Sequence, residues 1–203
     1  PIFKRFWESL EKFMLPRLSH AYTVSDSIAR IYTEKYRINF QVVRNYPPKG
    51  FYSPVNTHRQ GESSRMILYQ GALNKGRGLE KAILSMKYVS GARLVIAGEG
   101  DIKNELENLV EDENLSLKVR FLGRLPIGEL RKITPLASVG LSIEEDLCLS
   151  YHYALPNKLF DYIQALVPVI VTDLPEMAAV VRHYEVGEVI SSLDPEDLGK
   201  VLE

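Results

Sequence analysis

The 203-residue chain is 45% hydrophobic and 25% charged, which is ordinary globular composition with enough apolar residues for a substantial core. No apolar run approaches the roughly 20 residues of a membrane-spanning helix, and a net charge of −1 argues against nucleic acid as the main partner. Cys148 is the only cysteine, which excludes an internal disulfide and suits a cytoplasmic location, and neither it nor the four histidines cluster at metal-ligand spacing.

The first segment, residues 1–18, places apolar side chains at helical spacing with charged residues between them. Residues 1–48 carry eight Lys/Arg against four Asp/Glu, whereas residues 49–203 carry seventeen against twenty-two. A basic start suits the inner face of an anionic membrane, and it equally suits a solvated helix face. We expect the apolar stripe to pack against protein, with peripheral membrane contact as the alternative.

The next elements are short. Residues 21–25 indicate a strand, followed by a helix over about 27–36 with Ser25 or Asp26 as its N-cap. A second strand is expected at 41–45. Residues 47–64 are rich in Pro, Gly, Ser, Asn and Gln, which is typical of a linker or a long surface loop.

From residue 66 onward, six β-rich runs alternate with six helical stretches. The runs are 66–71, 93–98, 119–123, 139–143, 167–173 and 185–191, and the helices are expected over about 78–88, 101–112, 127–133, 157–166, 175–183 and from Pro195. This alternation predicts an α/β fold with a Rossmann-like, doubly wound parallel six-stranded sheet. Ligands of such sheets bind beyond the carboxyl ends of the strands, which are Gly71, Gly98, Gly123, Ile143 and Asp173.

The first strand end opens a glycine-rich loop, GALNKGRG, residues 71–78. Its glycines allow close backbone approach to a ligand, and Lys75 and Arg77 add charge suited to phosphate oxygens. The spacing matches neither a P-loop nor the dinucleotide fingerprint GxGxxG, and at Gly98-Glu99-Gly100 the third glycine position holds Lys103. A nicotinamide dehydrogenase is therefore disfavoured. A plain strand-to-helix turn with two surface cations is the alternative.

The segment SYHYALPNKLFDY, residues 150–162, carries the most chemistry. Pro156 and Asn157 indicate a helix start, with Asn157 as a candidate cap, and free N–H groups there favour an anion. Lys158 places a positive charge in this first turn, at the positive end of the helix dipole. We expect a bound anion or a nearby carboxylate to compensate this charge. Asp161 lies one turn further on the same face. A lysine for diphosphate and a carboxylate for sugar hydroxyls suit a nucleotide, and a surface ion pair between them is the alternative.

Taken in order, several segments resemble the donor-binding, C-terminal domain of the GT-B glycosyltransferases of family 4, the glycosyl transferases group 1. They are AYTVSDSIARIY, VVRNYPP, YQGALNKGRGLEKAI, RLVIAGEG and LPNKLFDYIQALVPVIVTDLPEM, and the resemblance covers about residues 20–203. It implies that residues 1–48 are a remnant of the N-terminal acceptor domain with the linker. Residues 49–203 are then the nucleotide-sugar-binding domain.

The resemblance also implies a set of site residues. The family usually has an Arg where Ala72 stands and a Glu where Tyr153 stands, so Tyr153, His152, Lys158 or a backbone group would take over the role of that Glu. Asp161 falls on the second carboxylate position, which contacts the ribose. The implied residues for donor and nucleotide binding are Gly71, Asn74, Lys75, Arg77, Tyr153, Leu155, Asn157, Lys158 and Asp161. Lys158 and Arg77 are the implied catalytic cations.

The activity implied by the resemblance is transfer of a sugar from a nucleoside-diphosphate-sugar to an acceptor with retention, by a hexosyltransferase-type enzyme in glycan or polysaccharide biosynthesis. Helix N-termini and cations would stabilise the departing diphosphate, with no metal or cofactor. Because the acceptor site belongs to the missing N-terminal domain, we expect this piece to bind nucleotide and to transfer little or no sugar. A non-catalytic nucleotide-binding module, favoured by Tyr153, and a sugar-nucleotide epimerase, which needs a proton-abstracting carboxylate or His, are the alternatives.

Overall fold

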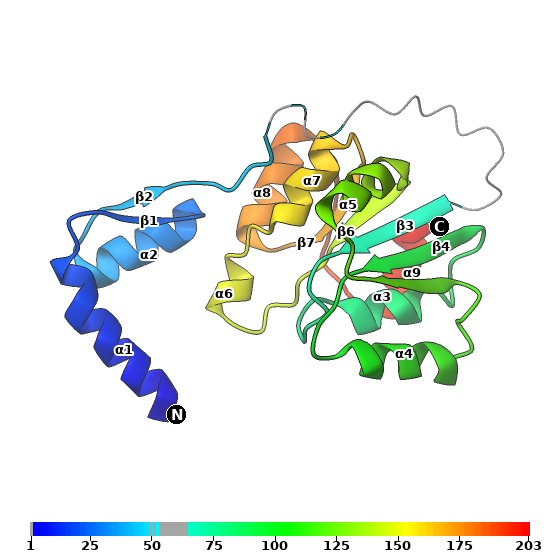
Figure 1. Cartoon of the computed structure of the whole chain (residues 1–203), viewed down its shortest axis with the longest axis horizontal. Helices are drawn as coiled ribbons and strands as arrows, with labels where there is room; N and C mark the ends of the chain where they lie inside the picture. The colour runs from blue at the N-terminus through cyan, green and yellow to red at the C-terminus, as the bar shows by residue number, and fades with distance from the viewer. Residues whose placement is uncertain (1, 49, 51, 53–64) are drawn as a thin grey trace. The chain divides into compact units, whose positions relative to one another are not determined.

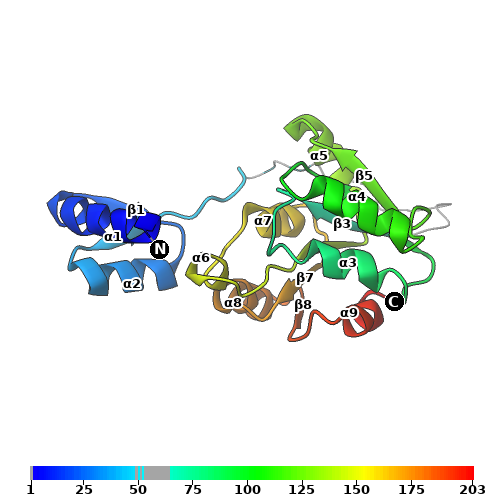
Figure 2. The same cartoon turned by 90° about the horizontal axis from the view of Figure 1, so that it is seen from below.

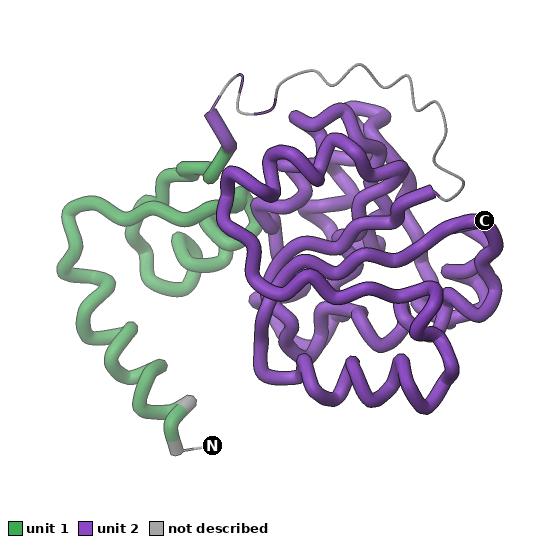
Figure 3. Tube along the Cα trace, turned by 45° about the vertical axis from the view of Figure 1, so that its right-hand side comes forward, with its two compact units in different colours: residues 1–46 green, residues 47–203 purple. Residues whose placement is uncertain are grey.

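The computed structural model describes residues 2–48, 50, 52 and 65–203. The chain divides into two compact units, residues 1–46 and 47–203, coloured green and purple in Figure 3. The boundary between the two parts predicted from the sequence lies two residues later, after residue 48. The linker predicted over 47–64 lies mostly outside the described residues.

In the first unit, residues 2–46 are described and contain two α-helices and two strands. They are α1 (Ile2–Met14), followed by the 3-10 turn η1 (Leu15–Arg17), β1 (Ala21–Thr23), α2 (Asp26–Tyr36) and β2 (Phe40–Val42). The two strands pair in parallel. Ser25 is the N-cap of α2, because its side chain accepts a hydrogen bond from the backbone N–H of Ile28 at 3.4 Å. Of the two caps considered, Ser25 is therefore the one used.

The second unit is built on a parallel sheet of six strands in the order β5-β4-β3-β6-β7-β8. The strands are β3 (Arg65–Gln70), β4 (Ala92–Ala97), β5 (Val119–Gly123), β6 (Val139–Ser142), β7 (Val169–Thr172) and β8 (Gly187–Ile190). The predicted Rossmann-like six-stranded sheet is confirmed. The order runs one way from β3 to β5 and the other way from β6 to β8, so the connections leaving β3 and β6 diverge and a crevice opens at their carboxyl ends.

Helices cover both faces of this sheet. They are α3 (Leu79–Ser85), α4 (Lys103–Asp112), α5 (Ile127–Ile133) with the turn η2 (Thr134–Leu136), α6 (Leu149–His152), α7 (Asn157–Gln164), α8 (Pro175–Tyr184) and α9 (Pro195–Leu202). In Figures 1 and 2, α3, α4 and α9 lie on one face and α5, α7 and α8 on the other. No helix is predicted from the sequence between residues 143 and 157, and the short helix α6 corrects that expectation.

The contact between α7 and the sheet positions the first turn of α7 beside β3. The Tyr162 hydroxyl donates a hydrogen bond to Leu68 O and accepts one from the backbone N–H of Gln70, each at 3.0 Å. Tyr162 is fully buried. A Cβ at Gly140 of β6 would collide with its ring, so a glycine is needed where the helix crosses the strand. Pro156 is the N-cap of α7 and no side chain caps the helix, which corrects the expected cap at Asn157.

Candidate functional site

The glycine-rich loop, residues 71–78, packs against the segment that follows β6. Gly76 and Gly78 have φ angles of +81° and +70°, in the left-handed region that glycine tolerates. A Cβ at Gly76 would lie 2.7 Å from Leu147, and one at Gly78 would collide with the carbonyl oxygen of Ile143. In addition, the Tyr151 hydroxyl donates to the Lys75 carbonyl at 2.9 Å. These contacts fix the end of β3 and the end of β6 to each other.

Three charged side chains meet beneath this loop. Oε1 of Glu144 accepts from Nζ of Lys158 at 2.8 Å and from a guanidinium nitrogen of Arg77 at 3.2 Å. Glu144 is fully buried, and the Lys158 side chain is 7% exposed. The Lys158 ammonium also lies 4.1 Å from the centroid of the Tyr69 ring, and the Arg77 guanidinium lies 5.0 Å from that of Tyr151. We call Arg77, Glu144 and Lys158 the charge cluster.

The charge cluster keeps its carboxylate ionised. Burial alone would raise the pKa of Glu144, but Lys158, the hydrogen bond from Ser142 and Arg77 together hold it below its ordinary value. With two cations and one carboxylate, the cluster carries a net charge of about +1. Nε of Arg77 is buried and has no hydrogen-bond partner among the described residues. The cluster thus carries positive charge and contains one buried N–H donor that no described residue uses.

A pocket of about 350 Å³, which we call the α7 pocket, opens above the charge cluster. Its lining residues come from the end of β3, the glycine-rich loop and the start of α7, and they are Tyr69, Gln70, Gly71, Ala72, Arg77, Pro156, Asn157 and Lys158. Because no side chain caps α7, the helix N-terminus is free to meet an anion. Two cations and a helix N-terminus thus surround one pocket, and groups of this kind attract the oxygens of a phosphorylated ligand.

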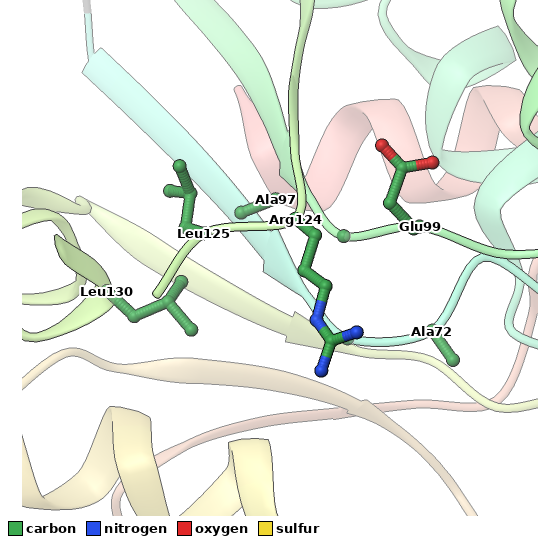
Figure 4. Close-up of a pocket in the computed structure, with 8 residues that line it drawn as sticks. Ala72, Ala97, Glu99, Arg124, Leu125 and Leu130 are labelled. Atoms are coloured by element: carbon green, nitrogen blue, oxygen red, sulfur yellow. The ribbon is translucent and has the colours of Figure 1, made fainter. Parts of the chain in front are cut away.

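A second pocket of about 330 Å³, which we call the Arg124 pocket, shares Gly71 and Ala72 with the first. Figure 4 shows the Arg124 side chain extending toward Ala72, with Leu125 and Leu130 to one side and Glu99 to the other. The remaining lining residues are Ala97 and Gly98 of the β4 end. Gly123, at the neighbouring strand end, is predicted from the sequence to lie near a ligand, whereas Arg124 itself is not.

Asp161 belongs to a separate hydrogen-bonded network. Its Oδ2 accepts from Nε2 of Gln70 at 3.1 Å, and Oε1 of Gln70 accepts from the Thr134 hydroxyl at 2.8 Å. The buried Tyr52 hydroxyl hydrogen-bonds with the side chains of Asp161, Gln70 and Thr134. Burial raises the pKa of Asp161, although the hydrogen bonds from Gln70 and Tyr52 partly oppose that rise. Burial also raises the pKa of Tyr52 to about 12.

The structure separates the predicted site residues into two groups. Gly71, Arg77, Asn157 and Lys158 line the α7 pocket together. Neither described pocket includes Asn74, Lys75, Tyr153, Leu155 or Asp161 in its lining.

Each residue of the second group has another environment. Oδ1 of Asn74 accepts from the backbone N–H of Asp101 at 3.4 Å, and Lys75 is exposed. The Tyr153 ring packs edge-on against His152, with 4.5 Å between centroids, and Leu155 is buried in the core.

The carboxylate that compensates Lys158 is Glu144, which the sequence analysis does not single out. The alternative of a surface ion pair between Lys158 and Asp161 is wrong, because Lys158 is buried against Glu144 and Asp161 accepts from Gln70. The described residues contain no group of three or more His, Cys, Asp or Glu that could hold a metal ion. The expectation that the protein needs no cofactor stays a prediction.

Comparisons with known proteins agree with this arrangement. The family model for glycosyl transferases group 1 matches residues 55–203. The uncharacterized glycosyltransferase MJ1607 of Methanocaldococcus jannaschii is 27% identical over 140 residues, which cover 68% of this chain and 34% of that protein.

Solved structures show the same fold. HepE of Anabaena, in a crystal structure with UDP and glucose, matches with a TM-score of 0.80 at 12% identity, covering 96% of this chain and 55% of that one. WaaG, a glycosyltransferase involved in lipopolysaccharide biosynthesis, matches with a TM-score of 0.72 at 16% identity, covering 89% and 52%. The chain therefore spans about half the length of these two solved relatives and about a third of MJ1607.

Proposed function

Because the chain belongs to the glycosyl transferases group 1 family, we propose that residues 47–203 bind the nucleoside-diphosphate-sugar donor of a glycosyltransferase. The observation that carries this proposal is the α7 pocket, where Arg77, Lys158 and an uncapped helix N-terminus meet around a space of about 350 Å³. HepE, whose fold is the same, has been crystallised with UDP-glucose.

In this proposal the diphosphate occupies the α7 pocket. Breaking the bond between the sugar and the diphosphate leaves negative charge on the departing phosphate oxygens. Lys158, Arg77 and the N–H groups at Asn157 would stabilise that charge more strongly in the transition state than in the bound donor. The role of these groups would be electrostatic. It would be effective because the groups are already in place before the reaction starts and do not have to reorganise during it.

The nucleoside of the donor would occupy the Arg124 pocket. Both pockets share Gly71 and Ala72, so one ligand can pass from the first into the second along this backbone. Leu125 and Leu130 supply apolar surface for a base, and the Arg124 guanidinium can stack on it or donate to it. Gly71 and Gly98 are in close backbone contact, since a Cβ at Gly98 would collide with the Gly71 carbonyl, so position 98 needs a residue without a side chain.

For Asp161 we propose a contact to the ribose hydroxyls through its free acceptor capacity. Its partner Gln70 lines the α7 pocket, so the carboxylate lies one hydrogen bond behind the pocket wall. Lys75, Asn74, Tyr153 and Leu155 are supported less well as ligand contacts, because they line neither pocket and, unlike Asp161, none of their side chains has a hydrogen bond to a lining residue among the described residues.

The remaining steps of the reaction belong to the whole protein. We propose transfer of a hexose with retention of configuration, in glycan or polysaccharide biosynthesis, without metal or cofactor. The role of WaaG in lipopolysaccharide biosynthesis supports the pathway class, and the family resemblance supports retention. Because the solved relatives are about twice as long as this chain, we propose that residues 1–46 belong to an acceptor domain and that the present chain alone transfers little sugar.

The exposed apolar face of α1 is a candidate surface for interaction with a partner. Phe3, Phe6, Trp7, Phe13 and Met14 are each at least half exposed. We propose that this face packs against further protein, with contact to an anionic membrane surface as the second candidate because Arg5, Lys12 and Arg17 lie on the same segment. None of the described helices is long and apolar enough to cross a membrane.

A non-catalytic nucleotide-binding module is the second candidate function. The observation that favours it is Tyr153, which stands where the family has a carboxylate and lies outside both pockets. Transfer assays on a longer protein that includes the acceptor domain would separate the two functions.

Calorimetric titration of the 203-residue chain with UDP, GDP and ADP tests the donor-binding proposal. We expect at least one diphosphate to bind, and thermal denaturation to show about 2.7 kcal/mol of stabilisation at a hundredfold excess over its dissociation constant. Absence of binding by all three would contradict the proposed function.

A further inference from the structure

We infer that Glu144 is a positioning residue that holds Lys158 and Arg77 in place so that the α7 pocket selects a diphosphate; this inference rests on the proposed function. Glu144 is fully buried and does not line the pocket. It therefore acts through the two cations rather than by touching the ligand.

Both carboxylate oxygens and the backbone carbonyl of Glu144 have a hydrogen-bond or ion-pair partner. Oε1 accepts from both Lys158 and Arg77, and Oε2 accepts from the Ser142 hydroxyl at 2.9 Å. The Glu144 carbonyl accepts from the Thr172 hydroxyl at 2.7 Å. Ser142 and Thr172 are the last residues of the adjacent strands β6 and β7, so the carboxylate is anchored to the rigid end of the sheet.

Without this carboxylate the two cations have no shared partner. Lys158 and Arg77 come from different elements, yet both reach the same oxygen atom, so their charged groups lie close together. Like charges at such a separation repel, and a lysine side chain has many other rotamers available. Glu144 removes the repulsion and limits the rotamers, so that the donors that do not bond to it remain available to the pocket.

Glu144 lowers the net charge of the two cations from about +2 to about +1, so its contribution to binding comes from holding the cations in place and not from its own charge. The cluster keeps a net charge of about +1 and an unpartnered, buried Arg77 Nε. A dianionic or trianionic diphosphate gains from this charge, whereas an uncharged nucleoside does not. We therefore expect the effect of Glu144 to be specific to the phosphorylated part of the ligand.

The test compares Glu144→Gln, which keeps the shape and removes the charge, with Glu145→Gln as the matched control at the next position. Calorimetry measures the affinity of the 203-residue chain for UDP, GDP or ADP, whichever binds, and for inorganic pyrophosphate, and saturation-transfer NMR measures the matching nucleoside. We expect Glu144→Gln to weaken both phosphorylated ligands about tenfold or more and the nucleoside less than about twofold. Glu145→Gln should leave all three affinities as in the wild type.

A parallel loss of diphosphate and nucleoside would overturn the inference, because it would show a structural role only. Unchanged diphosphate binding by Glu144→Gln would overturn it as well. If Glu144→Gln does not fold, Ser142→Ala, which removes one hydrogen bond from the carboxylate, replaces it, with an expected twofold to fivefold loss (on the order of 1 kcal/mol) confined to phosphorylated ligands. Failure of the wild-type chain to bind any diphosphate would instead contradict the proposed function.

A double-mutant cycle tests whether Glu144 acts through Lys158. In the Lys158→Gln background, adding Glu144→Gln should reduce diphosphate affinity by a smaller factor than it does in the wild type, because only Arg77 is then left for Glu144 to position. Additive losses in the double variant would show that Glu144 acts independently of Lys158 and would overturn the assigned role.

Discussion

Nε2 of Gln70 lies 3.1 Å from Oδ2 of Asp161, and this hydrogen bond ties the last residue of β3 to the second turn of α7. The same two elements carry the walls of the α7 pocket. The Tyr52 hydroxyl joins both side chains, so residue 52 of the segment before β3 is tied to the pocket wall as well. Substitutions of Asp161 or Tyr52 should therefore change the stability of the fold, and denaturation experiments measure that change without any ligand.

Asp161→Asn should reveal the energetic effect of burying this carboxylate. Because burial raises the pKa of Asp161, the folded protein holds the proton more tightly than the unfolded chain, so the ionised form destabilises the fold at neutral pH. This penalty is relieved as the pH falls through the raised folded pKa toward the ordinary value of 3.8. We expect Asp161→Asn to be at least as stable as the wild type at neutral pH, with an advantage that shrinks in acid. Urea denaturation across this pH range measures the difference in unfolding free energy between Asp161→Asn and the wild type. A difference that does not change with pH would contradict the expectation.

Tyr52→Phe should change the alkaline limit of stability. Burial raises the pKa of the Tyr52 hydroxyl to about 12, against an ordinary value of 10.0, so the folded protein keeps the proton while the unfolded chain loses it. Stability from this group is therefore lost as the pH rises from 10 toward about 12. The Phe variant should lack this decline, and at neutral pH it should be less stable by about 0.5–1.5 kcal/mol through lost hydrogen bonding. Denaturation of both proteins at neutral and alkaline pH measures the free energy of unfolding. If this free energy falls equally steeply with alkaline pH in the wild type and in Tyr52→Phe, the burial of the Tyr52 hydroxyl is contradicted.

Gly78→Ala should destabilise the fold more than Gly91→Ala does. Both glycines have positive φ angles, +70° and +62°, so an alanine at either position is strained by about 1–2 kcal/mol. Only at Gly78 would the new Cβ also collide with a neighbour, the Ile143 carbonyl, whereas Gly91 has nothing within 4 Å. Chemical denaturation gives the loss of unfolding free energy in each variant, and the difference between the two losses measures the packing of the loop. Equal losses would show that the glycine-rich loop does not pack tightly against the segment after β6.

Lys158→Ala should weaken diphosphate binding more than nucleoside binding. Among the described residues, the substitution also leaves Arg77 as the one cationic partner of the buried Glu144, so we expect a loss of stability of about 3–5 kcal/mol. Calorimetry with the diphosphate and NMR titration with the nucleoside give the two affinities below the variant's unfolding temperature. Equal weakening of both ligands would remove Lys158 from its proposed place beside the phosphates.

The sequence predicts the sheet well because a parallel strand covered on both faces is an unbroken apolar run. β7 is the clearest case, since all of Val169–Thr172 are buried. Element ends are predicted less well: Asn157 has the side chain of a cap, but the chain bends at Pro156 and the helix begins without a cap. The four-residue helix α6 is too short to show helical periodicity.

The partners within the site could not be predicted because they are set by packing between distant segments. The sequence calls for an anion or a carboxylate beside Lys158, yet nothing local indicates Glu144, which precedes it by fourteen positions in the segment after β6. Tyr52 and Asp161 are further apart still, in a linker and a helix. Arg124 directly follows a strand end where ligands are expected, but the direction of its side chain depends on the loop that carries it.

The most direct test of the donor pocket is a crystal structure of the chain with the nucleoside diphosphate that it binds. We expect phosphate oxygens within hydrogen-bonding distance of Lys158 Nζ and of the first backbone N–H groups of α7, with the base between Arg124 and Leu130. A diphosphate bound elsewhere, with the charge cluster unchanged and the α7 pocket empty of phosphate, would contradict it.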